Sequence, residues 1–195
     1  MDASSTRYTV IFQESDLPNS MPPPIDIQQL VQKGKQEYAS RSYQTAAQAF
    51  ESAAQAFNSQ GDPLSAAEMN NNRSVALLKA GKFQQALDAA LGTDLVFAQA
   101  DDKKRQAMAL GNQAAALEEL KRLDEALDLY QRSAELFADI GEGDLRSTVL
   151  KSAAAIELKR GRLMGSGMKM IGSLEAKDRP SILDRIMKFI LRLGK

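Results

Sequence analysis

The chain of 195 residues contains no cysteine, no histidine and no tryptophan. Without cysteine and histidine, the usual ligands of zinc, copper and haem are missing, together with cysteine nucleophiles and the commonest general base. The lack of cysteine also excludes a disulfide framework. Carboxylates alone can bind a metal, but no acidic cluster has the spacing of a calcium-binding EF-hand. We therefore predict no metal site and no cofactor.

Other motifs that the sequence lacks exclude further classes of function. No phosphate-binding glycine loop and no nucleophile elbow occurs, so the sequence predicts a protein that is not an enzyme. The basic C-terminal region has Phe189 as its only aromatic residue, which argues against nucleic-acid binding because stacking platforms are missing. No apolar run is long enough to span a membrane, and the first residues are too polar for a secretory signal. We expect a cytoplasmic protein.

Charge and proline are unevenly distributed, although the net charge is zero. Four of the six prolines precede residue 25, so residues 1–24 are predicted to be a flexible N-terminal arm. Residues 25–158 carry 14 basic and 19 acidic side chains, a net charge of −5. Residues 159–195 carry 10 basic and 3 acidic side chains, a net charge of +7. A basic end thus follows an acidic body.

A fixed period of about 40 residues runs through the body of the chain, as is typical of a stack of identical supersecondary units. Three aromatic residues have this spacing, and each is followed at the same short interval by an acidic residue: Phe57, Phe97 and Phe137, then Asp62, Asp102 and Glu142. Alanines recur with the same period at Ala46, Ala86 and Ala126. We predict units at about 27–66, 67–106 and 107–146, and a degenerate unit at 147–178.

Each of the first three units reads as two helices separated by a short break. The breaks are predicted at residues 40–42, 80–82 and 120–122. The second helix of each unit has apolar residues along one helical face and ends at the recurring phenylalanine. Asp26 is predicted to cap the first helix, and Gly61 with Asp62 and Pro63 marks a turn. These features predict an all-α, right-handed α-solenoid of antiparallel helix hairpins over residues 25–178.

These units resemble the tetratricopeptide repeat family. The residues that carry the resemblance are Leu30, Gly34, Ala46, Phe50 and Ala53 in unit one, Ser74, Leu77, Gly81, Phe83 and Ala86 in unit two, and Leu110, Ala114, Leu117, Ala126 and Tyr130 in unit three. The period of this chain is longer than the roughly 34 residues of a typical repeat in the family. In its period the chain is similar to the long-repeat subclass found in kinesin light chains. The resemblance implies a non-catalytic adaptor or scaffold that binds a peptide segment of a partner protein in a concave groove.

The resemblance also implies which residues line that groove. In the family, the first helix of each unit forms the concave face. The positions that match it here are Gln32, Lys35, Tyr38, Asn71, Asn72, Val75, Lys79, Met108, Asn112, Glu119, Lys151 and Ser152. In this register Gln32, Asn72, Asn112 and Ser152 are equivalent, and we expect a ladder of polar side chains that binds a peptide backbone.

The C-terminal part leaves several alternatives open. Glycine-rich residues 160–178 read as a weak last repeat, an adaptable methionine-rich surface or a loop. Residues 179–195 are predicted to form a basic amphipathic C-terminal helix. That helix could cap the solenoid, anchor a membrane-peripheral assembly factor, or bind another protein, including a second copy in a self-assembling scaffold.

Overall fold

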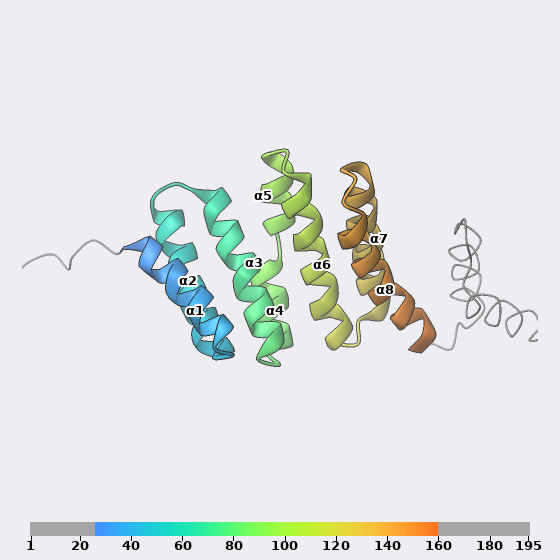
Figure 1. Cartoon of the computed structure of the whole chain (residues 1–195), viewed down its shortest axis with the longest axis horizontal. Coiled ribbons are helices and arrows are strands. Elements are labelled where there is room, and N and C mark those ends of the chain that lie inside the picture. The colour runs from blue at the N-terminus through green and yellow to red at the C-terminus, as the bar shows by residue number, and fades with distance from the viewer. Residues whose placement is uncertain (1–25, 160–195) are drawn as a thin grey trace, which may run out of the picture.

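The structure is a computed structural model, and it describes residues 26–159 of the chain (Figure 1). The predicted arm at 1–24, residues 160–178 and the predicted capping helix at 179–195 lie outside the described residues. All the elements within 26–159 are helices: α1 (Ile27–Ala39), α2 (Tyr43–Ser59), α3 (Pro63–Lys79), α4 (Phe83–Ala90), α5 (Thr93–Gln99), α6 (Lys103–Glu119), α7 (Leu123–Asp139) and α8 (Gly143–Lys159).

The helices stand side by side in chain order, from α1 and α2 at one end to α7 and α8 at the other (Figure 1). Except at the break between α4 and α5, short turns make consecutive helices antiparallel neighbours, so α1, α3, α6 and α8 alternate with α2, the α4–α5 pair and α7. The predicted all-α solenoid of helix hairpins is confirmed for this part of the chain.

The same turn chemistry recurs at regular intervals, at half the period of the sequence repeat. Residues 41, 61, 81, 101, 121 and 141 all have a positive φ, between 55° and 74°. After each of them, the next backbone N–H bonds back to a carbonyl in the last turn of the preceding helix at 2.9–3.0 Å, as from Asp62 to Phe57 and from Asp102 to Phe97. This is the Schellman ending of an α-helix. The recurring phenylalanines therefore occupy equivalent positions, each supplying the carbonyl that closes the turn.

The acidic residue that follows each phenylalanine also caps the N-terminus of the next helix in two of the three units. The Asp62 carboxylate accepts a hydrogen bond from the backbone N–H of Ser65 at 3.0 Å, and the Asp102 carboxylate from that of Arg105 at 2.8 Å. Asp26 caps α1 in the same way, as predicted, by accepting from Gln28 at 3.0 Å. Each cap contributes about 1 kcal/mol.

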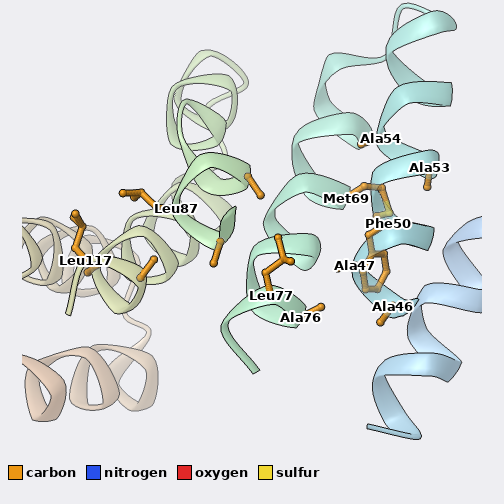
Figure 2. Packing of buried hydrophobic residues seen from close by; sticks show 14 of the residues in the cluster. Ala46, Ala47, Phe50, Ala53, Ala54, Met69, Ala76, Leu77, Leu87 and Leu117 are labelled. Atoms are coloured by element: carbon orange, nitrogen blue, oxygen red, sulfur yellow. The ribbon is translucent and has the colours of Figure 1, made fainter. Parts of the chain in front are cut away.

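The core consists of small residues where helices cross and of larger side chains between them. Ala46, Ala86 and Ala126 are all fully buried, as their period predicts. Phe50 on α2 lies against Gly34 on α1, where an added Cβ would come within 2.6–2.9 Å of the phenyl ring. From the other side, Met69 on α3 reaches towards Phe50 (Figure 2). The first two hairpins are thus joined around one aromatic ring.

One sequence prediction is wrong. The second helix of unit two was expected to run unbroken from Phe83 to Phe97, but it ends at Ala90 and a new helix begins at Thr93. Leu91 is extended, with a ψ of 129°, and Gly92 has a φ of 78°. Glycine adopts this left-handed conformation without strain, so Gly92 permits the break.

Buried polar groups satisfy the backbone at this break. The amide of Gln113 on α6 donates to the carbonyl of Ala90 at 3.1 Å and to the carboxylate of Asp94 at 2.7 Å. The hydroxyl of Thr93 donates to the same Ala90 carbonyl at 2.7 Å. The side chains of Gln113, Asp94 and Thr93 are all buried. Without these hydrogen bonds, burial of their polar groups would lower the stability of the fold.

Candidate functional site

The predicted site residues all lie on the first helix of each hairpin. We call the surface that they form the A face: Gln32, Lys35 and Tyr38 on α1, Asn71, Asn72, Val75 and Lys79 on α3, Met108, Asn112 and Glu119 on α6, and Lys151 and Ser152 on α8. On each helix these residues are mostly three or four apart, which places them on one side of the helix.

Exposure separates these residues into three groups. Five are charged or polar and exposed, namely Gln32, Lys35, Lys79, Glu119 and Lys151. Asn72, Val75, Asn112, Ser152 and Tyr38 are half-buried. Met108 is apolar but 41% exposed, whereas Asn71 is only 6% exposed. The middle of the A face, on α3 and α6, therefore combines accessible apolar surface with accessible amides.

A pair of amides joins α3 and α6 in the middle of this face. The Nδ2 of Asn112 donates a hydrogen bond of 2.8 Å to the Oδ1 of Asn71. The sequence register made Asn72 the equivalent of Asn112, but the direct partner is the preceding residue, since neighbours on a helix point about 100° apart. Asn72 is half-buried and makes no side-chain hydrogen bond within residues 26–159.

A second pair joins the same two helices nearer the N-terminus of each. The guanidinium of Arg105 on α6 lies 3.0 Å from the carboxylate of Glu68 on α3 and 2.6 Å from that of Asp102. It also stacks over the ring of Phe97, 5.1 Å from its centroid. The hydrogen bond to Asp102 raises the pKa of Arg105, and the backbone N–H of Arg105 lowers the pKa of Asp102. Sequence reasoning missed Arg105, although its place in the first turn after a helix cap was a usable signal.

A buried tyrosine on α7 contacts two of the helices that carry the A face. Tyr130 on α7 is 4% exposed, and its hydroxyl donates to the carboxylate of Glu118 on α6 at 3.3 Å. A hydrogen bond with Ser152 connects it to α8. Burial raises the pKa of Tyr130 to about 12. Tyr130 thereby fixes Ser152 relative to α6.

On α1, at the other end of the A face, the predicted residue Tyr38 already packs against another aromatic side chain. The ring of Tyr38 packs edge-on against Tyr43, with centroids 5.4 Å apart and an interplanar angle of 62°. This contact holds the turn between α1 and α2. Gln32 and Lys35, earlier on the same helix, remain the exposed part of α1 on this face.

The structure also has a pocket that sequence reasoning missed. It measures about 490 Å³ and lies between α4, α6 and α7, lined by Leu87, Leu91, Gln113, Leu117, Arg122, Asp124, Glu125, Asp128 and Leu129. Figure 2 shows Leu87 and Leu117 on their two helices. Gln113 and Leu117 point about 100–180° away from Met108 and Asn112 around α6, so this pocket does not open on the A face. Gly92 inside an otherwise helical pattern was the signal that could have located it.

The A face carries the side-chain amides of Gln32, Asn71, Asn72 and Asn112. Side-chain amides present both a donor and an acceptor, which matches the repeating groups of a peptide backbone. In residues 26–159, no three acidic side chains come together in a way that could hold a metal ion. Over the same residues, no helix has both the length and the apolar character needed to cross a membrane.

Comparisons with known proteins show the fold and leave the family open. No protein-family model matches the chain, and no curated protein matches it. Among solved structures, the Rap conjugation gene regulator of the plasmid pLS20, in complex with the Phr* peptide, is similar with a TM-score of 0.65 at 15% identity. The similarity covers 85% of this chain and 48% of the regulator, so the chain spans about half of that protein's length. The chain is a helical repeat protein.

Proposed function

We propose that this protein is a non-catalytic adaptor of the tetratricopeptide type, which binds a peptide segment of a partner protein along the A face. The observation that carries the proposal is the row formed by Asn72, Val75, Met108 and Asn112, which brings half-buried amides and accessible apolar groups together on two adjacent helices. The amide of Asn72 would bind the peptide backbone, Val75 and Met108 would contact the peptide side chains, and Asn112 would hold α6 in place through its bond to Asn71.

The rigidity of this row supports the proposal. The Asn71–Asn112 bond and the Glu68–Arg105 ion pair both connect α3 to α6 and set the distance between the two halves of the row. A surface that is already in place loses less conformational freedom on binding. The solved neighbour is, by its description, a regulator in complex with a peptide, and its similarity of fold makes peptide binding a reasonable function for this chain.

Selection of peptides tests the proposal and requires no named partner. A library of random peptides is displayed and selected on the immobilised full chain, and the affinity of the recovered peptides is measured by calorimetry. Asn72→Ala is expected to weaken binding roughly threefold to tenfold, because one hydrogen bond contributes about 0.5–1.5 kcal/mol. Met108→Ala should weaken it to a similar degree.

Gln55→Ala is the matched control, because Gln55 is exposed on α2 and lies outside the A face. It should leave the affinity unchanged. Selected peptides that bind equally well to the wild type, to Asn72→Ala and to Met108→Ala would show that the A face is the wrong surface.

A further inference from the structure

The pocket between α4, α6 and α7 has an apolar interior that reaches the surface. Its walls include Leu87, Leu117 and Leu129, and Leu91 at its edge is 59% exposed. The helix break creates this arrangement, since α4 stops at Ala90 and the extended Leu91 lies between two helices. An exposed leucine that continues into an apolar pocket offers a binding surface to another apolar segment.

Acidic groups dominate the rim of this pocket. The lining contains Asp124, Glu125 and Asp128 against a single cation, Arg122. Arg122 already binds Glu125 in a bidentate pair, with distances of 2.6 and 2.7 Å. Asp128 lies 3.8 Å from Arg132 and its side chain is 70% exposed, which makes this ion pair weak. An occupant with an apolar face and basic flanks would match both the walls and the rim.

The described chain ends at the same end of the helices as part of this pocket. Because α8 runs antiparallel to α7, its last residue, Lys159, lies at the end of the hairpin where α7 begins. The pocket residues Arg122 to Leu129 belong to that same end. The connection formed by residues 160–179 can span up to about 66 Å when extended, so the distance to the pocket imposes no restriction.

The segment after this connection has the required chemistry. Residues 180–195 carry 4 basic side chains and 1 acidic side chain. If helical, as predicted, they place Ile182, Ile186 and Ile190 on one face. The proposed peptide-binding function leaves this segment without a role, and the acidic body of the protein attracts its positive charge.

We infer that residues 180–195 bind within the same molecule to the pocket lined by Leu87, Leu91, Leu117 and Leu129, with their basic side chains at the acidic rim. The inference is independent of the A face, because the pocket lies on the other side of α6. The segment covers Leu91, which the helix break leaves exposed, and its cations face Asp128, whose ion pair with Arg132 is weak.

The absence of cysteine allows a direct test on the full chain. A nitroxide is attached to the single cysteine of Lys195→Cys, and the loss of backbone amide signals is recorded by NMR at low protein concentration. Signals of residues 87–92 and 122–129 should lose most of their intensity, whereas those of α1 should keep theirs. The same loss in a mixture of labelled chains and separate isotope-enriched chains would instead identify a second copy as the occupant and overturn the inference.

Matched variants add a second test. Leu91→Ser should restore the signals, whereas Leu95→Ser should not, because Leu95 is equally exposed at 61% but does not line the pocket. Asp128→Lys should likewise restore them, and Glu135→Lys, elsewhere on α7, should not. All four side chains are exposed, so the stack should tolerate each change.

The contrary results are equally clear. Full intensity at 87–92 and 122–129 in the wild type would overturn the inference. If the same chain then co-floated with phosphatidylserine vesicles, the segment would be assigned to a membrane surface. Signal loss confined to α8 would assign it to the end of the stack.

Discussion

Asn112 on α6 donates a hydrogen bond of 2.8 Å to the buried side chain of Asn71 on α3. This bond connects the second and third hairpins within the row proposed to bind peptide. Asn71, at 6% exposure, has little access to water and depends on this partner. The neighbouring Asn72 is half-buried and forms no side-chain hydrogen bond within residues 26–159.

Truncation of Asn112 and truncation of Asn72 should therefore have different effects on the free energy of unfolding. Asn112→Ala is expected to lower the free energy of unfolding by about 1–3 kcal/mol, because it leaves the buried amide of Asn71 unpaired. Asn72→Ala should change it by no more than about 0.5 kcal/mol. Urea denaturation measures both. Equal losses would contradict the assignment of separate structural and binding roles.

The contrast between Asn71 and Asn72 also shows where the sequence stops being informative. The repeat period located the buried alanines and the breaks between paired helices, because these recur at equivalent positions in each unit. The choice between adjacent asparagines depends on the rotation and distance between two helices, which no local pattern contains. The prediction of peptide contact for the A-face residues stays a prediction.

The helix break at Leu91 and Gly92 was missed for a related reason. Phe83, Ala86, Ala90, Thr93 and Phe97 maintain a helical spacing through the break, so the pattern predicted one helix. The groups that stabilise the break come from Gln113, on a later helix, and from the buried carboxylate of Asp94. Gly92 was a local warning, but only the tertiary partner makes the break stable.

Two helical glycines should respond in opposite directions to alanine. Gly34→Ala places a methyl group 2.6–2.9 Å from the ring of Phe50 and should cost about 1–3 kcal/mol through overpacking. Gly111→Ala meets Ser133 and Val149 no closer than 3.6 Å and should gain about 0.5–1 kcal/mol from helix propensity. Thermal unfolding followed by circular dichroism checks both, and a stabilised Gly34→Ala would disprove the close packing of α1 on Phe50.

The recurring turns predict a stabilising substitution. Arg41 and Lys121 occupy the left-handed position that Gly81 fills in the equivalent turn, with φ of 64° for both against 72°. Arg41→Gly and Lys121→Gly should each raise the free energy of unfolding by about 0.5–1 kcal/mol, because the left-handed conformation is strained for residues with a Cβ. Gly81→Ala should lower it by a similar amount.

Arg41→Gln is the control for the loss of charge. It keeps the Cβ and removes the guanidinium, so it should give no gain in stability. If Arg41→Gln stabilises the protein as much as Arg41→Gly does, charge rather than backbone conformation is responsible, and the turn argument fails.

The raised pKa of Tyr130 predicts that the protein loses stability at alkaline pH. Burial raises its pKa from 10.0 to about 12 in the folded protein. Between these values the unfolded chain loses the phenolic proton and the folded protein keeps it, so the free energy of unfolding falls as the pH rises from 10 towards 12. The contribution of Tyr130 is fully present below pH 10, and its loss is on the order of 2 kcal/mol by pH 12.

Tyr130→Phe isolates this effect from the deprotonation of lysines. Urea denaturation of both proteins between pH 8 and pH 11.5 should show a difference in stability that shrinks steadily above pH 10. A constant difference over the whole range would mean that the Tyr130 hydroxyl titrates as it does in the unfolded chain.

Mapping of a bound peptide by NMR tests the central claim most directly. A peptide selected on the full chain is added to isotope-enriched protein, and the backbone amide shifts are followed through the titration. Saturable changes should concentrate on α3 and α6 around Asn72 and Met108 and extend to the exposed sides of α1 and α8. Changes confined to residues 87–92 and 122–129, with the A face undisturbed, would contradict the account.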